Sequence, residues 1–327
     1  MKKILVISNR LTRFVKDDIE ILSRSFDVKY FNNVVFSHGL LRSVKKSEVI
    51  IVWFNSKHTI WPFLLAKLFK KKIILITGGY DTANIPEINY GLRQNYFISS
   101  LLNLVVNYSN WVIVNSRFAF NELNSYGVRT DHVTTLFHAL VEPQANVNTK
   151  RVKQILYVGD VTKSNLKRKG LEYFLEYSSI NLDYRFVCIG KISDKMLREL
   201  SGQYERVQFT GFIEESELIS YFKKSSIIFQ LSRHEAFGLS VVQAMNYGCV
   251  PIVLRDSGAL PEVISPFGFV LGYYNDIMIS TLINDVEELS SEYRFEMSNY
   301  IMNKYSITNR EKGFRSIINS LTINSLN

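Results

Sequence analysis

The sequence predicts an α/β protein with two doubly wound domains, in which helices cover both faces of a parallel sheet. Short apolar runs rich in β-branched residues recur along the chain, separated by segments of helical length. Many of these runs are continuously apolar, which is typical of strands covered on both faces. The chain has 327 residues, and at about 150 residues per domain this length indicates two domains.

Twelve apolar runs are expected to form strands, six in each half of the chain. The runs of the first half are Ile4–Ile7, Val28–Phe31, Val49–Phe54, Ile73–Thr77, Trp111–Asn115 and Val133–His138. The runs of the second half are Ile155–Gly159, Phe186–Gly190, Val207–Phe209, Ile227–Leu231, Val250–Leu254 and Gly268–Leu271. Because ligands of doubly wound sheets bind beyond the carboxyl ends of the strands, the residues just after these runs are candidates for a site.

Three of the intervening segments carry clear helix signals. One begins in the acidic stretch 214–217 and ends at the basic pair 223–224, which matches the helix dipole at both ends. A second is expected from about residue 240 to 247, where Gly248 ends it. The long apolar region 96–114 is interrupted by serine and asparagine, so we expect a buried helix followed by a strand rather than a membrane span.

A polar stretch with a proline, 141–150, lies between the halves and is expected to be a linker. It places the first domain at residues 1–145 and the second at 150–300, with a helical segment over 300–327. Two cysteines are too few for a disulfide framework in a chain of this length, which indicates a reducing compartment. The apolar part of the N-terminus is too short for a secretion signal, so we expect a cytoplasmic protein.

The formal net charge of +9 arises entirely from residues 1–150. This asymmetry indicates an anionic partner for the first half. No nucleic-acid recognition motif is present, so an acidic membrane surface or an acidic saccharide is favoured over nucleic acid. The densest patch is 59–72, in which apolar side chains precede a lysine cluster. It fits an interfacial helix at an anionic bilayer, or equally a core helix whose lysines offset its dipole.

The stretch 229–245 carries the most chemical information. A predicted strand ends at Leu231, a loop carries Glu235, and a turn containing Gly238 opens a helix. The first amides of a helix form an anion site, and the glycine allows a ligand to approach the backbone closely. A carboxylate placed just before that site can accept hydrogen bonds from hydroxyl groups. The pattern therefore predicts a site for a phosphorylated polyol or a nucleotide sugar.

This stretch resembles the donor-site signature of retaining glycosyltransferases of family 4, which have the GT-B fold of two Rossmann-like domains facing across a cleft. That signature is a glutamate followed, after seven residues, by a second acidic position, usually around Phe-Gly-Leu. Here it is followed by Gly-Cys-Val-Pro-Ile-Val at 248–253 and Gly-Ala-Leu-Pro-Glu-Val-Ile at 258–264. The stretch 155–159 with Lys169 resembles the phosphate-binding loop of the same family, and 207–213 resembles the segment facing the nucleotide base.

The resemblance implies transfer of a sugar from a nucleotide diphosphate sugar to a saccharide or lipid-linked acceptor, with retention of anomeric configuration. It implies that Glu235 holds sugar hydroxyls and stabilises the reacting centre, and that Lys169, with Arg168, neutralises the diphosphate. The further donor-site candidates are Gly159, Phe212, Ile213, His234, Ala236, Phe237, Gly238, Leu239, Ser240 and Gln243. The family also implies that the C-terminal helical segment returns to the first domain.

The sequence departs from the family pattern at two positions. Gln243 stands at the second acidic position, where it can still bind ribose hydroxyls, or can complete a helix capping box with Ser240. Asp160 stands where the family has arginine, and a long loop with Lys163 and Lys167 then leads to the basic pair 168–169. These departures motivate an alternative function, a non-catalytic nucleotide-sugar-binding subunit of the same fold.

In the first half, the loop that follows the predicted strand 73–77 is the best acceptor-side candidate. Gly78 and Gly79 allow close backbone approach, and Asp81 is a second catalytic candidate facing the cleft, or else a residue that organises a tight turn. Arg10 follows the first strand and is assigned to the acceptor side. No Asp-x-Asp motif occurs, so we expect neither an essential metal nor a cofactor.

Overall fold

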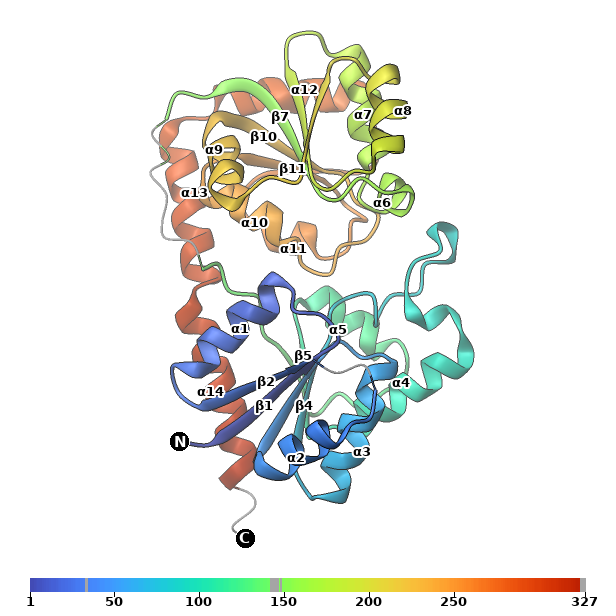
Figure 1. Cartoon of the computed structure of the whole chain (residues 1–327). Helices are drawn as coiled ribbons and strands as arrows, with labels where there is room; N and C mark the ends of the chain where they lie inside the picture. The colour runs from blue at the N-terminus through green and yellow to red at the C-terminus, as the bar shows by residue number, and fades with distance from the viewer. Residues whose placement is uncertain (33–34, 142–146, 148, 324–327) are drawn as a thin grey trace. The chain divides into compact units, whose positions relative to one another are not determined.

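The computed structural model describes residues 1–32, 35–141, 147 and 149–323 (Figure 1). Contacts within the chain divide it into two compact units. Unit 1 comprises Met1–Val141 together with Tyr305–Asn327, and unit 2 comprises Glu142–Lys304. The C-terminal segment therefore belongs to the same unit as the N-terminal half.

Unit 1 is built on a six-stranded parallel sheet with the order β2-β1-β3-β4-β5-β6. Its strands are β1 (Lys3–Ser8), β2 (Asp27–Asn32), β3 (Val49–Trp53), β4 (Lys72–Ile76), β5 (Trp111–Val114) and β6 (Val133–Thr135). All five residues of β3 are buried, as expected of a strand covered on both faces. The strand order reverses between β1 and β3, so the unit is doubly wound.

Two groups of helices cover the two faces of the unit 1 sheet. One face carries α1 (Arg13–Ser23) and α14 (Ile307–Ile323), whose apolar side chains share one core cluster. The other face carries four helices that share a second cluster: α2 (His38–Lys46), α3 (Ile60–Leu68), α4 (Tyr96–Tyr108) and α5 (Arg117–Asn124). Short 3-10 helices occur at η1 (Lys57–Thr59), η2 (Pro86–Ile88) and η3 (Leu92–Gln94).

A buried ion pair joins α14 to α1. Arg310 donates to both carboxylate oxygens of Asp18, at 2.5 and 2.7 Å, and the two side chains are 1% and 2% exposed. The same guanidinium donates to the carbonyls of Leu136 and Phe137, at 2.8 and 2.6 Å. Because a buried charge needs full compensation, this network fixes where the C-terminal helix lies on unit 1.

Unit 2 contains a second six-stranded parallel sheet with the order β12-β11-β10-β7-β8-β9. Its strands are β7 (Val152–Val158), β8 (Arg185–Ile189), β9 (Val207–Gly211), β10 (Ser225–Gln230), β11 (Val250–Leu254) and β12 (Phe269–Leu271). With these, all twelve strands predicted from the apolar runs are confirmed. Their ends differ from the predictions by a few residues.

The helices of unit 2 lie between and after these strands. They are α6 (Lys163–Arg168), α7 (Leu171–Ile180), α8 (Asp194–Gln203), α9 (Glu215–Lys224), α10 (Leu239–Asn246), α11 (Leu260–Ile264), α12 (Asp276–Glu288) and α13 (Ser291–Lys304). The helices predicted from the charges at 214–224 and from Gly248 are confirmed as α9 and α10. A loop was predicted between residues 160 and 169, which is wrong, because the hydroxyl of Thr162 caps a short helix, α6, there.

The predicted helix after residue 96 exists as α4 and is followed by β5, but its predicted burial is wrong. Only Leu102, Val105 and Val106 are buried, and the opposite side of the helix is exposed. None of the helices in the described residues is both long and apolar enough to cross a membrane. The predicted linker, 141–150, includes residues 142–146 and 148, which lie outside the described residues.

Candidate functional site

The loops that follow β7 and β10 meet at the carboxyl edge of the unit 2 sheet. The amide of Arg233 donates to the carbonyl of Arg168 at 2.8 Å, and Gln230 Nε2 donates to the carbonyl of Lys169 at 3.3 Å. Gly170 has a φ of 65°, and a Cβ there would lie 1.9 Å from the Leu231 carbonyl oxygen. Only glycine fits at this position, so the backbone itself holds the basic pair beside the loop that follows β10.

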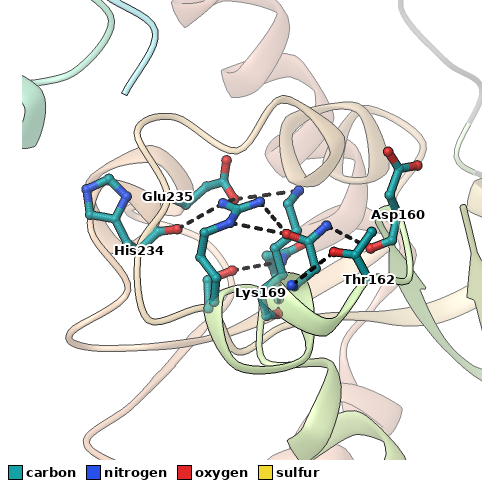
Figure 2. A network of polar contacts seen from close by, with 9 residues as sticks. Asp160, Thr162, Lys169, His234 and Glu235 are labelled. Carbon is teal, nitrogen blue, oxygen red and sulfur yellow. Dashed lines mark hydrogen bonds and ion pairs between the residues drawn. The ribbon is translucent and has the colours of Figure 1, made fainter. Parts of the chain in front are cut away.

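This arrangement places the carboxylate of Glu235 against two cations. Its Oε2 lies 3.6 Å from Nη1 of Arg168 and 3.6 Å from Nζ of Lys169. The three side chains are only 13–19% exposed. Burial alone would raise the pKa of the Glu235 carboxyl, but Lys169 and Arg168 outweigh burial and hold this pKa below its ordinary value. Figure 2 shows Glu235 and Lys169 within this network.

The motif at 258–264 holds the backbone of Glu235 in place. The Glu235 amide donates to the carbonyl of Ser257 at 3.0 Å, and its carbonyl accepts from the amide of Ala259 at 2.8 Å. Gly258 has a φ of 81°, and a Cβ there would lie 2.5 Å from the Glu235 carbonyl oxygen. The glycine in this motif therefore allows two loops to pair closely and orients Glu235 from both sides.

The helix α10 begins directly after this loop with an uncapped N-terminus. Its N-cap is Gly238, with a φ of 92° and no side-chain hydrogen bond. Among the described residues, nothing accepts from the amides of Leu239 and Ser240. These amides and the helix dipole can bind an anion such as phosphate. The capping-box interpretation of Ser240 with Gln243 is wrong, because Ser240 is already the second residue of the helix.

The side chains that support the cations come from α6. Asn165 Oδ1 accepts from Nε and Nη2 of Arg168, at 3.2 and 2.8 Å. Asp160 Oδ1 accepts from the amide of Lys191 at 3.1 Å, and Figure 2 shows Asp160 on the opposite side of the network from Glu235. A Cβ on Gly159 would lie 3.1 Å from Lys169 Cδ, so the lysine side chain passes directly over this glycine.

The remaining predicted donor-side residues lie at different depths. His234, Phe237 and Gln243 are buried, whereas Ala236 is only partly buried. Because the Phe237 ring belongs to the core, only its backbone is available to a ligand. Phe212 and Ile213 follow the edge strand β9, where the Phe212 ring is 65% exposed and lies 5.4 Å from Lys191 Nζ.

In unit 1, the carboxylate of Asp81 organises a turn. One oxygen accepts from the amides of Gly78 and Gly79, both at 2.9 Å, and the other accepts from the amide of Asn55 at 2.6 Å. Burial raises the pKa of Asp81, although these donors oppose the shift. This is the structural role that the sequence left open, and a catalytic role for Asp81 stays a prediction.

The turn at Asp81 borders a cavity of about 390 Å³ within unit 1. Phe54 lines it with a φ of 67°, a strained conformation for an aromatic residue. Gly78 makes room for this ring, since a Cβ there would lie 2.4 Å from Phe54 Cδ1. The guanidinium of Arg10 lies over the same ring, 5.0 Å from its centroid. Gly78 and Arg10 thus line the same cavity, as does Asp81.

The residues that position this machinery were not predicted from the sequence. Asn165 orients Arg168, and its own amide donates to the capping hydroxyl of Thr162 at 3.2 Å. A threonine three residues before an asparagine is a weak helix-start signal that could have revealed α6. In unit 1, the buried Arg93 donates to the carbonyl of Asp81 at 3.0 Å, and no sequence pattern indicates it.

Two doubly wound units, one of which holds a glutamate beside two cations just before a helix N-terminus, are the arrangement expected of GT-B glycosyltransferases. The profile of the family "Glycosyl transferases group 1" matches residues 141–304, which is half of the chain. This chain therefore belongs to that family. In the described residues, no three His, Cys, Asp or Glu side chains gather as a metal site would require.

Solved structures of GT-B proteins share this fold at low sequence identity. The Anabaena protein Alr3699/HepE, in complex with UDP and glucose, superposes with a TM-score of 0.77 at 13% identity, over 98% of this chain and 100% of that chain. Sucrose-phosphate synthase from Thermosynechococcus elongatus gives a TM-score of 0.75 at 12% identity, over 98% and 99% of the two chains. These comparisons establish the GT-B fold that the sequence predicts.

A curated relative is similar in sequence as well. It is an uncharacterized 41.2 kDa protein in the cps region of Klebsiella pneumoniae, 26% identical over 245 residues. The match covers 69% of this chain and 65% of the relative, so this chain spans less than two thirds of the length of that protein.

Proposed function

We propose that this chain is a retaining hexosyltransferase that uses a nucleotide diphosphate sugar as donor and a saccharide or lipid-linked molecule as acceptor. The observation that carries the proposal is the ionised Glu235 carboxylate, which lies between two cations just before an uncapped helix N-terminus. A nucleotide diphosphate sugar carries the matching groups, since its diphosphate is anionic and its sugar presents hydroxyls. The bound UDP of the structural neighbour HepE is consistent with this donor class.

The chemistry follows from where charge develops during transfer. As the bond between the sugar and the diphosphate breaks, negative charge grows on the leaving phosphate oxygen. Lys169, Arg168 and the first amides of α10 take up this charge without reorganising, because the fold already holds them in place. Glu235 holds the sugar hydroxyls and stabilises the positive charge that develops at the anomeric carbon. We assign it no nucleophilic role.

The acceptor is proposed to bind to unit 1, in the cavity bordered by Arg10, Phe54 and Gly78. An aromatic ring can stack on the apolar face of a sugar, and Arg10 can bind an anionic group of the acceptor. The relative in the cps region supports a role in polysaccharide assembly. We propose that the protein works in the cytoplasm, where nucleotide sugars and reduced cysteines are both found.

One alternative function is supported by specific residues. Gln243 stands at the family's second acidic position without a charge, and the Asp160 carboxylate accepts from the backbone where the family has arginine. A nucleotide-sugar-binding subunit without turnover would tolerate both departures. The two functions differ in one measurable property, which is transfer by the purified chain.

The decisive experiment measures nucleoside diphosphate release and sugar transfer by the purified chain, using a panel of nucleotide sugars and saccharide acceptors. Lys169→Ala and Glu235→Gln should each lower kcat about 10²–10³-fold, the usual cost of removing one preorganised electrostatic contact. The matched control is Lys195→Ala on α8, where the lysine is 80% exposed, and it should turn over like the original chain.

Near-normal turnover by either variant would contradict the assignment of its residue. Tight binding of a nucleotide sugar with no turnover for any donor and acceptor pair would favour the non-catalytic subunit.

A further inference from the structure

Two neighbouring helices of unit 1 turn apolar side chains toward solvent. On α3 these are Trp61, Leu64 and Leu68, which are 43%, 50% and 70% exposed. On α4 they are Tyr96 (80%), Phe97 (82%), Leu101 (39%), Leu104 (52%) and Tyr108 (60%). We call these eight side chains the α3–α4 face. Contiguous exposed apolar surface is uncommon on a monomeric protein and marks an interaction site.

The two helices are neighbours in the fold, and one contact joins their exposed sides. The helix α3 connects β3 to β4, and α4 connects β4 to β5, so adjacent strands place the two helices next to each other on one face of the sheet. The ammonium of Lys67 on α3 lies 5.9 Å from the centroid of the Tyr108 ring on α4. Phe36, which is 42% exposed, packs on Trp61 with ring centroids 5.1 Å apart and extends the surface.

Neither helix of the α3–α4 face contains an acidic residue. Between residues 49 and 121 the only acidic residues are Asp81 and Glu87, and neither belongs to α3 or α4. Asp81 is also buried, with its carboxylate bound to the backbone. The basic residues on and beside α3 are Lys57, Lys67, Lys70, Lys71 and Lys72. The face is therefore apolar, aromatic and bordered by lysine.

We propose that the α3–α4 face docks on an anionic membrane surface, with the apolar side chains in the interfacial region and the lysines at the phosphate groups. Tryptophan and tyrosine prefer the level of the lipid headgroups, and lysines nearby add electrostatic attraction to anionic lipids. A second copy of this chain fits less well, because a symmetric interface would bring the lysines of the two copies together.

The test is sedimentation of the full chain with vesicles, and it does not depend on the transferase activity. The chain should bind to vesicles of phosphatidylglycerol and phosphatidylcholine but not to phosphatidylcholine alone. Lys70→Gln combined with Lys71→Gln should weaken binding roughly 25-fold, which is about fivefold for each charge removed. Leu64→Ser combined with Leu104→Ser should weaken it about tenfold or more, by removing buried apolar surface.

Matched control variants come from exposed positions of unit 2. Leu182→Ser with Ile277→Ser removes two branched aliphatic side chains, which are 67% and 79% exposed. Lys195→Gln with Lys224→Gln removes two exposed lysines. These variants should bind vesicles like the original chain. The emission of Trp61 should also shift to shorter wavelength with anionic vesicles, and Trp61→Phe should abolish that shift.

Three results would overturn the proposal. The first is that the chain binds neither kind of vesicle. The second is binding that survives both pairs of substitutions in α3 and α4 while the variants remain folded by circular dichroism. The third is a concentration-dependent dimer, seen by sedimentation velocity, that Leu64→Ser with Leu104→Ser dissociates, since this would assign the face to a second copy of the chain. Transfer to a water-soluble acceptor should be unchanged in all these variants, which separates this proposal from the proposed function.

Discussion

At the scale of single residues, the charge of Glu235 depends on its two neighbours. The side chain is largely buried, and burial alone disfavours the ionised form. The cations of Lys169 and Arg168 reverse this effect, so the carboxyl group stays ionised at neutral pH and somewhat below. A reaction that needs the carboxylate loses rate as the pH falls through the pKa of Glu235.

Lys169→Met should therefore move the acid limb of the pH profile. With one cation gone, burial is offset less, the pKa of Glu235 rises, and the loss of kcat/KM on acidification begins at higher pH. The measurement is kcat/KM against pH for the original chain, for Lys169→Met and for the exposed control Lys195→Met. An acid limb that stays in place in Lys169→Met, despite its lower rate, would argue against this electrostatic coupling.

Single site residues could be predicted from the sequence where they lie next to the end of a predicted strand or the start of a predicted helix. Glu235 follows a strand and Gly238 precedes a helix, so a local pattern was sufficient to select them, whereas Lys169 was selected through its resemblance to a family motif. Asp81 shows the limit of this reasoning. The same strand-then-glycine signal selected it, but whether its carboxylate faces a ligand or the backbone depends on Asn55, which lies far from it in the sequence.

At the scale of elements, the pairing of the loop after β7 with the loop after β10 is the feature that builds the site. Gly170 makes this pairing possible, because any side chain there would overlap the Leu231 carbonyl. Gly170→Ala should lower the free energy of unfolding by about 2–4 kcal/mol, the range for a residue forced into an incompatible conformation and a clash. It should also raise the KM for the donor, because Lys169 moves with this loop.

Gly202 provides the matched control for this change. It is the second-to-last residue of α8, its φ lies outside the left-handed region, and no atom lies within 4 Å of the position that a Cβ would occupy. Gly202→Ala should raise the free energy of unfolding by about 0.5–1 kcal/mol, the usual difference in helix propensity. Urea unfolding followed by circular dichroism measures both effects. Equal stabilities for the two variants would contradict the packing described at Gly170.

Helices and strands could be predicted where the local order of apolar, charged and glycine residues indicates them. Many of the twelve strands are continuous apolar runs, and the predicted helices at α9 and α10 have charges or a glycine at their ends. The burial of α4 was predicted wrongly because composition shows that a helix is apolar without showing which face is covered. The helix α6 was missed because it is only six residues long and has no apolar periodicity.

At the scale of the whole molecule, we propose that the chain supplies the positive charge that its donor requires. Lys169, Arg168 and the amides of α10 lie in one unit, and together they can neutralise a diphosphate. A metal-dependent transferase would instead lose several kcal/mol of charge stabilisation when the metal is removed. Transfer should therefore be unaffected by EDTA, and full activity should not require added Mg²⁺ or Mn²⁺. Loss of activity with EDTA that Mg²⁺ or Mn²⁺ restores would refute this prediction.

The structure shows how some of the lysines behind the net charge of +9 are placed on the protein surface. The sequence placed the excess in the first half and left open whether the lysines of 59–72 serve a core helix or a membrane surface. The structure shows that one side of α3 is packed in the core, with Pro62, Leu65 and Ala66 buried, while Trp61 and Leu68 on the other side are exposed. A membrane contact of the exposed side stays a proposal. The exposed side chains of α4 were not part of that prediction.

The α/β class, the twelve strands and the position of the loop that carries Glu235 could all be predicted from the amino-acid sequence alone. Each of these depends on the local order of apolar, glycine and charged residues, which can be followed along the chain. The contacts between side chains became known only from the folded structure: Arg168 meets Glu235, Asp81 meets the backbone of Asn55, and α3 meets α4. Such contacts join residues that are distant in sequence, and their geometry is set by how the strands pair and how the helices pack.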